Sequence, residues 1–173
     1  MPRQAKWANP WRCWNWFDPS ITAKGGEAEI VAAHIRFVRQ HYRADPKRVM
    51  AVGVSAGAAL AAALGLRYPR YVRAVATHAG IAYGAAPSAL LARDVMLRGP
   101  QSDVEAIGGQ ARGKFGGVLP VPLLAIHGDS DTVVSPANSV ALVRQYLRFN
   151  GHPAVSADTE AAAPPGAMPN ADC

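Results

Sequence analysis

A short apolar run, a glycine-flanked serine and an alanine-rich segment follow one another without a break in residues 48–67. The run at 48–54 lacks strict alternation of polar and apolar residues, as is typical of a strand buried on both faces. Residues 57–67 favour a helix, which ends near Pro69. A buried strand that passes directly into a helix is typical of a parallel sheet with helical crossovers.

The other periodic segments continue this alternation of helices and strands. We expect helices at 27–42, 57–67, about 87–96 and 136–149, and strands at 48–54, 72–78 and 121–127. The Gly-rich span 108–117 is expected to be mobile, and residues 151–173 to form a poorly ordered tail. The predicted fold class is therefore α/β, a parallel sheet with helices on both faces, within a domain of residues 1–150.

Composition excludes several classes of function. Half of the residues are hydrophobic, but no run of about 18 apolar residues predicts a membrane span, and residues 1–16 lack the apolar region of a signal peptide. The net charge is +6, yet the basic residues are scattered singly, so we expect no nucleic-acid partner. Cys13 and Cys173 have no ligand-spaced partners, so we expect no metal site, and their disulfide state stays open.

The serine of this segment lies in the motif Gly53-Val54-Ser55-Ala56-Gly57. Its position between a strand and a helix predicts a nucleophile elbow with Ser55 as the catalytic nucleophile. Side chains two residues before and after the serine would collide in such a turn, so both Gly53 and Gly57 are expected to be required. The Ala56 N–H at the helix N-terminus would serve as an oxyanion-hole donor. The alternative is a serine that only caps the helix.

Two aspartates follow the strand at 121–127, in the loop where an α/β-hydrolase keeps its triad acid. We expect the acid to be Asp131 rather than Asp129, because Asp131 completes a His-Gly-x-x-Asp-x-x-Val pattern that begins at His127. The alternative is that both aspartates only form hydrogen bonds within the turn.

A base should follow the acid in this fold, and His152 is the one histidine after Asp131. It follows a helix-stop sequence rather than a further strand, so we expect a capping or surface role for it. His127 is expected to be a structural residue at a strand end. His78, which also ends a strand, is expected to be a packing or hydrogen-bonding residue near the site. The two histidines of the helix at 27–42 should lie on its face.

The N-terminal segment at 11–17 holds three tryptophans. Aromatic side chains at this density either pack against a neighbouring element or form a wall beside a substrate cleft. The sequence favours the first interpretation and leaves the second open.

Five short segments occur together in a characteristic order and spacing. They are Cys13-Trp14-Asn15-Trp16-Phe17, Gly53-Val54-Ser55-Ala56-Gly57, His78-Ala79-Gly80, Tyr83-Gly84 and His127-Gly128-Asp129-Ser130-Asp131. Over about residues 3–150 the chain thus resembles the polyhydroxybutyrate (PHB) depolymerase family of esterases, which is related to feruloyl and acetyl-xylan esterases. The resemblance implies hydrolysis of polymeric or soluble carboxylic esters through an acyl-serine intermediate, with Ser55 as nucleophile, Asp131 as acid, no cofactor and an extracellular location.

The resemblance also implies two elements that do not occur in this sequence. Family members carry an earlier His-Gly-Cys loop, which supplies a second oxyanion donor, and a later Gly-His motif, which holds the catalytic histidine. We therefore expect an α/β-hydrolase fold truncated at both ends, in which Ser55 lacks its proton acceptor. The alternatives are a non-catalytic fragment or pseudoenzyme that only binds, and a peptidase or thioesterase on the same fold.

Overall fold

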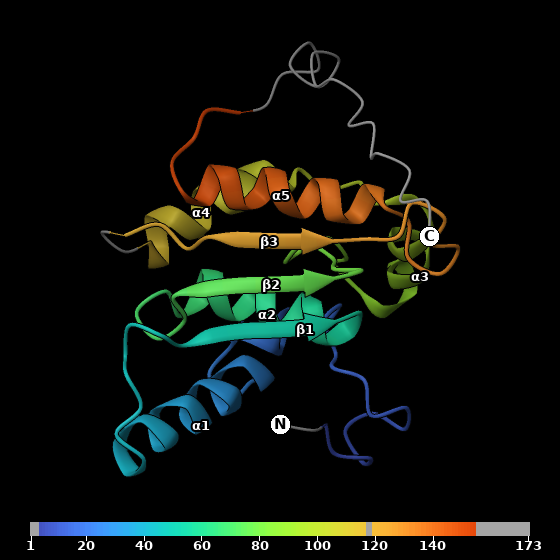
Figure 1. The fold of residues 1–173 in the computed structure, drawn as a ribbon. Coiled ribbons are helices and arrows are strands. Elements are labelled where there is room, and N and C mark those ends of the chain that lie inside the picture. The colour runs from blue at the N-terminus through green and yellow to red at the C-terminus, as the bar shows by residue number, and fades with distance from the viewer. Residues whose placement is uncertain (1–3, 117–118, 155–173) are drawn as a thin grey trace, which may run out of the picture.

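The computed structural model describes residues 4–116 and 119–154 of the chain. Its elements, in chain order (Figure 1), are η1 (Pro19–Thr22), α1 (Glu27–His41), β1 (Met50–Val54), α2 (Ala56–Arg67), β2 (Ala74–His78), α3 (Ala89–Arg98), α4 (Val104–Phe115), β3 (Leu123–Ile126) and α5 (Ala137–Phe149). Every expected helix and strand is present, with bounds that differ by at most two residues. The expected poorly ordered tail falls mostly on residues 155–173, which lie outside the described residues.

The three strands form one parallel sheet in the order β1-β2-β3. Helix α2 connects β1 to β2 and packs on both of them. Residues 58–66 of this helix are all buried, and most of them are alanine, whose small side chain lets the helix lie close to the sheet. Helix α5 completes this layer, where the Tyr146 hydroxyl donates a hydrogen bond to the Ala62 carbonyl oxygen at 2.8 Å. The core therefore lies between the sheet and the layer of α2 and α5.

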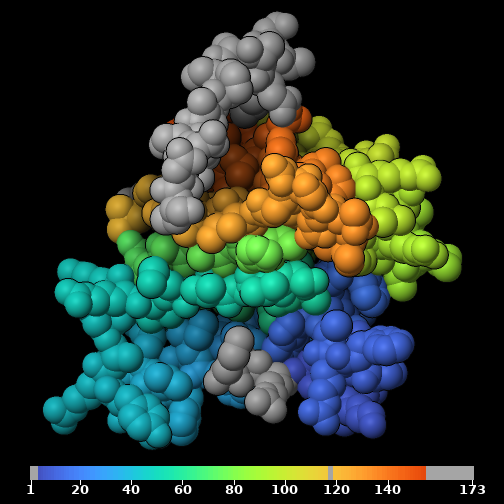
Figure 2. Space-filling model, turned by 45° about the vertical axis from the view of Figure 1, so that its right-hand side comes forward, coloured from blue at the N-terminus to red at the C-terminus, as the bar shows by residue number. Residues whose placement is uncertain are grey.

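The opposite face of the sheet is apolar but exposed. Five of its side chains are between 49% and 69% exposed: Met50, Val52, Val54, Leu124 and Ile126. In Figure 2 the atoms of β1 form a teal band at the surface of this view, with no helix in front of them. The expectation of helices on both faces is thus met on one face only, within the part of the chain that the structure describes. The apolar side chains of this face are shielded from water only when another element or a partner covers them.

The expected mobile span at 108–117 is wrong, because most of it belongs to helix α4. This helix packs along α5, and the contact depends on Gly108. A Cβ atom at Gly108 would lie 2.4 Å from the Gln145 carbonyl oxygen, so only glycine allows the two backbones to approach this closely. The glycine that favoured a loop in the sequence is therefore a packing residue of a helix.

Candidate active site

Ser55 occupies the turn between β1 and α2, as the motif predicts. Its backbone has φ 52° and ψ −123°, a strained conformation for a residue other than glycine. The Ser55 N–H donates to the His78 carbonyl oxygen at 2.9 Å, which ties the turn to the carboxyl end of β2. The side chain is exposed and makes no capping hydrogen bond. Since a capping serine has an extended backbone and a bonded hydroxyl, this geometry argues against the capping alternative.

The two glycines of the motif have different roles. A Cβ atom at Gly53 would lie 2.1 Å from the Gly57 carbonyl oxygen and 2.6 Å from the Ala58 nitrogen. A Cβ atom at Gly57 would meet only the Trp14 Cδ1 atom, at an ordinary contact distance of 3.9 Å. The expected steric requirement therefore holds for Gly53 but not for Gly57, because the collision is with the backbone of the helix start and not between two side chains.

The first backbone N–H of α2 is available to a ligand. Ser55 immediately precedes the helix, and its carbonyl oxygen accepts hydrogen bonds from Ala58 and Ala59. The Ala56 N–H has no hydrogen-bond partner among the described residues. A free N–H at a helix N-terminus favours an anion placed against it, so the local geometry suits an oxyanion beside Ser55.

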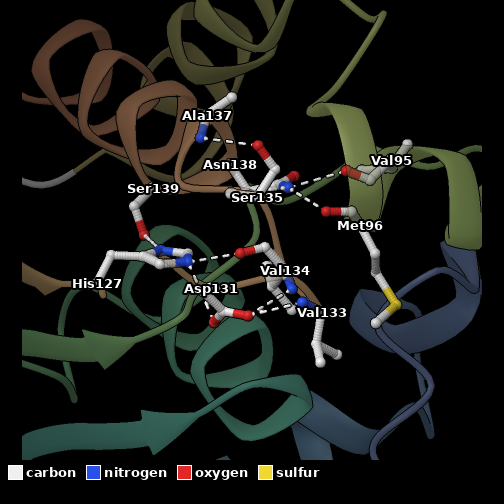
Figure 3. A network of polar contacts seen from close by, with 10 residues as sticks. All are labelled: Val95, Met96, His127, Asp131, Val133, Val134, Ser135, Ala137, Asn138 and Ser139. Atoms are coloured by element: carbon white, nitrogen blue, oxygen red, sulfur yellow. Dashed lines mark hydrogen bonds and ion pairs between the residues drawn. The ribbon is translucent and has the colours of Figure 1, made fainter. Parts of the chain in front are cut away.

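Asp131 lies in the loop after β3 (Figure 3). Because the strands are parallel, this loop leaves the sheet at the same edge as Ser55. Its Oδ1 atom accepts hydrogen bonds from the N–H groups of Val133 at 2.8 Å and Val134 at 2.9 Å. These bonds, the one from Val134 above all, hold the pKa of Asp131 below the ordinary carboxyl value. They are also the turn hydrogen bonds of the alternative interpretation, but they occupy only one of the two carboxylate oxygens.

The other carboxylate oxygen faces His127. Asp131 Oδ2 lies 3.5 Å from His127 Nε2, and the same ring nitrogen lies 2.8 Å from the Val134 carbonyl oxygen. Because a carbonyl oxygen only accepts, Nε2 carries the proton, and in the neutral ring Nδ1 accepts from the Ser139 hydroxyl at 2.6 Å. Both nitrogens of His127 are therefore engaged, which agrees with its expected structural role.

A buried asparagine fixes the far end of the same loop. Asn138, in the first turn of α5, donates from Nδ2 to the carbonyl oxygens of Val95 at 2.8 Å and Met96 at 3.1 Å (Figure 3). These bonds join the start of α5 to the end of α3. Sequence reasoning did not single out Asn138, because its partners lie more than forty residues away in the chain.

None of the five histidines hydrogen-bonds the Ser55 hydroxyl. His152 follows Asn150, which pairs with Val121 before the start of β3, so it lies at the opposite end of the sheet from Ser55. The two histidines of α1 belong to a helix that packs on α2 and η1. His78 ends β2 beside Val54 and is exposed, which places it nearest to Ser55 by strand register.

Two of the three tryptophans at 11–17, Trp14 and Trp16, are half-buried and pack against the core, as the first interpretation predicts. Trp7 and Trp11 are 90% and 85% exposed. Trp14 is half-buried and lines an apolar hollow of about 610 Å³ that runs along the outer edge of β1 to Ser55. Within the described residues this edge of β1 has no strand partner. Trp14 therefore fits both interpretations, because it packs against the core and also lines the hollow beside the candidate site.

The described residues include no group of three or more His, Cys, Asp or Glu side chains that could hold a metal ion. Cys13 is a free, exposed thiol, and Cys173 lies outside the described part. A search of the same residues finds no helix with the length and apolar character that crossing a bilayer requires.

The geometry of the acid loop makes a direct prediction. Asp131→Ala should leave the amide N–H groups of Val133 and Val134 without acceptors, so their hydrogen exchange should rise to that of an unprotected loop. Asp129→Ala is the matched control, because the Asp129 carboxylate is exposed and, within the described part of the chain, accepts only from the Ser130 hydroxyl, at 3.3 Å. Amide exchange followed by NMR measures both variants. Unchanged protection in Asp131→Ala would show that Asp131 does not hold this loop.

The lowered pKa of Asp131 also predicts how the stability of this loop depends on pH. Because the folded state lowers the pKa of Asp131, its contribution to stability is fully present above the unfolded-state pKa. That contribution is lost as the pH falls through the lowered folded-state value. The loop should therefore keep its hydrogen bonds throughout the neutral range.

Comparison with known proteins gives consistent matches. The family model described as Esterase PHB depolymerase matches residues 1–164. Poly(3-hydroxyalkanoate) depolymerase C of Paucimonas lemoignei is 34% identical over 153 residues, which are 87% of this chain and 37% of that protein. Feruloyl esterase B of Neurospora crassa is 28% identical over 148 residues, 80% of this chain and 51% of that protein.

A solved structure matches the fold. Acetyl xylan esterase from Aspergillus awamori superposes with a TM-score of 0.68 at 21% identity, over 80% of this chain and 54% of that one. The expected α/β-hydrolase fold class is thus confirmed. The chain spans between 37% and 54% of the length of these relatives.

Proposed function

The chain belongs to the Esterase PHB depolymerase family, and on that premise we propose that it is a serine esterase that hydrolyses carboxylic esters through an acyl-enzyme on Ser55. The proposed substrates are polyhydroxyalkanoates or related esters, and the proposed location is extracellular. In this mechanism the Ser55 hydroxyl attacks the ester carbonyl carbon, the alcohol leaves, and water then releases the acid. No metal or organic cofactor takes part.

The observation that carries this proposal is the conformation of Ser55. A strained, positive-φ serine whose exposed hydroxyl has no hydrogen-bond partner among the described residues is maintained at a cost to stability. The hydroxyl stands beside the free Ala56 N–H, which would stabilise the oxyanion that forms in the attack. Asp131, held ionised on the same edge of the sheet, would orient the base as the triad acid.

The test is covalent labelling with a fluorophosphonate probe, read by intact mass. The native chain should gain the mass of one probe adduct, and Ser55→Ala should gain none, because the probe reacts with an activated serine hydroxyl. Ser135→Ala is the matched control. Among the residues that the structure describes, its hydroxyl accepts only from the Ala137 N–H at 3.4 Å, so the loss of this serine should leave labelling unchanged.

Histidine variants locate the base. His152→Gln should label like the native chain, since His152 lies at the far end of the sheet. His78→Gln tests the ring that register places nearest to Ser55. Labelling of Ser55→Ala as fast as the native chain would contradict Ser55 as the nucleophile.

A second candidate function is binding without turnover. It is favoured by one observation, that none of the five histidines hydrogen-bonds the Ser55 hydroxyl, so no histidine is placed to accept its proton. It predicts a folded chain, by circular dichroism, that neither labels nor hydrolyses esters. An amide and thioester panel beside the ester panel separates the esterase proposal from a peptidase or thioesterase on the same fold.

A further inference from the structure

A second hollow, of about 630 Å³, lies away from Ser55 in the helical layer. It is lined by residues of η1 and the segment before it, the last turn of α2, the loop after β2 and helix α4, and it is open to solvent on one side. It shares no lining residue with the apolar hollow beside Ser55. The proposed mechanism therefore makes no use of it.

The charges that line this second hollow are unbalanced. Lys24, Arg67 and Lys114 contribute three positive charges, and Asp18 contributes the one negative charge. The Asp18 carboxylate caps η1 by accepting from the Ser20 N–H at 2.8 Å. No ion pair within the described part of the chain involves any of the three cations. A concave site lined by uncompensated positive charge attracts anions.

Arg67 is held in place by aromatic faces and not by an acid. Its guanidinium carbon lies 4.3 Å from the centre of the Phe115 ring and 5.1 Å from that of Tyr68. Its Nε atom makes a long hydrogen bond of 3.5 Å to the Thr22 carbonyl oxygen. The terminal guanidinium nitrogens have no acceptor among the described residues. This leaves a paired donor fork, the group that binds a carboxylate in two-point contact.

The second hollow also has flat apolar walls. Trp16, Tyr83 and Phe115 line it, and each is half-buried. The Tyr83 hydroxyl lies 2.8 Å from the Thr22 hydroxyl, so these two hydroxyls are hydrogen-bonded to each other. The aromatic face of Tyr83 is the part of this side chain that can contact a ligand. Lys114 Nζ lies 5.2 Å from the centre of the Phe115 ring, so two cations share the neighbourhood of one aromatic ring.

We propose that this second hollow binds a small molecule that carries a carboxylate on a flat apolar body, with the carboxylate on Arg67 and Lys114 and the body against the aromatic walls. The site follows from the cations and the rings alone. The choice of a carboxylate over other anions rests on the proposed function, because ester hydrolysis releases a carboxylic acid. The second hollow is thus a site for an aromatic carboxylic acid of the kind that hydrolysis of an aromatic ester would release, separate from Ser55.

Isothermal titration calorimetry of Ser55→Ala, which cannot turn over an ester, tests the site. The probe is cinnamate, and its neutral amide, cinnamamide, has nearly the same shape without the charge. Cinnamate should bind about tenfold more tightly than cinnamamide, as expected for one charge interaction at a partly exposed site. Equal binding of both, or no heat from cinnamate up to about 10 mM, would overturn the proposal.

Variants assign the binding to the named cations. Arg67→Met and Lys114→Met should each weaken cinnamate binding about five- to tenfold, while cinnamamide binding stays unchanged. Lys47→Met loses the same charge at an exposed turn outside the second hollow and should bind like the parent. Lys114 is exposed, so Lys114→Met should fold even if Arg67→Met does not. Equal weakening in Lys47→Met would mean a general charge effect and would refute the site.

Catalysis at Ser55 and carboxylate binding in the second hollow are tested by separate experiments, so each can be refuted without the other. Fluorophosphonate labelling reports on Ser55 and does not depend on Lys114, whereas calorimetry is carried out without the serine hydroxyl. A chain that labels but does not bind cinnamate refutes the carboxylate site alone. A chain that binds cinnamate but does not label refutes catalysis alone.

Discussion

Gly53→Ala should lower the free energy of unfolding by about 3 kcal/mol or more, a large share of the stability of a small domain. The new Cβ atom would lie 2.1 Å from the Gly57 carbonyl oxygen and 2.3 Å from the Gly57 carbonyl carbon. These are backbone atoms at the start of a helix whose residues 58–66 are all buried, so the clash cannot be relieved by a side-chain rotation. The elbow must open or α2 must shift against the sheet.

Gly57→Ala is the matched control for this prediction. The same methyl group added four residues later meets only Trp14, at 3.9 Å, and replaces a glycine in the first turn of a helix. Its effect should lie between zero and a gain of about 1 kcal/mol. Urea denaturation followed by circular dichroism measures both variants. A similar loss of unfolding free energy in both variants would show that glycine is required at both positions, as the motif alone predicts.

The labelling experiment extends this pair to function. Gly53→Ala should lose fluorophosphonate labelling even under conditions where it remains folded, because the position of Ser55 depends on the turn. Gly57→Ala should keep it, since its backbone is not displaced. A labelled, folded Gly53→Ala would show that the hydroxyl tolerates a shifted elbow.

The order of strands and helices was predictable because its signals are local. The apolar run before Ser55 and the alanine-rich segment after it each carry their own periodicity, and the turn between them has a steric signature in Gly53. The Asp131 loop was predictable for the same reason, since its hydrogen bonds reach only two and three residues along the chain.

Features that depend on distant contacts were missed. Most of helix α4 was predicted to be a mobile, glycine-rich span. Gly108 does not form a turn there, because it allows close contact with Gln145, thirty-seven residues away in the chain. The hydrogen bond of His127 Nδ1 is made with Ser139. The packing of α5 on β3 brings this serine close to His127. The exposed sheet face was missed because an apolar strand sequence is the same whether one face or both are covered.

Gln145→Leu, a change in α5, should lower the free energy of unfolding by about 3 kcal/mol or more. Gln145 is fully buried, and its Oε1 atom accepts from the Tyr83 N–H at 2.9 Å. Its Nε2 atom donates to the carbonyl oxygens of Tyr83 at 2.8 Å and Val104 at 3.3 Å. Leucine has nearly the same volume but no polar atoms, so the N–H and the carbonyl oxygen of half-buried Tyr83 and the carbonyl oxygen of Val104 would lose a hydrogen-bond partner at once.

The same change should reach the second hollow. Gln145 holds the backbone of Tyr83, one of its aromatic walls, and that of Val104, the first residue of α4, which carries Lys114 near its other end. Gln145→Leu should therefore weaken cinnamate binding at a urea concentration where the protein is still folded. Gln101→Leu, an exposed position between α3 and α4, should change unfolding free energy by less than about 0.5 kcal/mol and leave binding intact. If Gln145→Leu unfolds earlier in urea but binds cinnamate normally while folded, then Gln145 supports the core without shaping the hollow, and the aromatic walls must be held by the pairing of Tyr83 with Thr22.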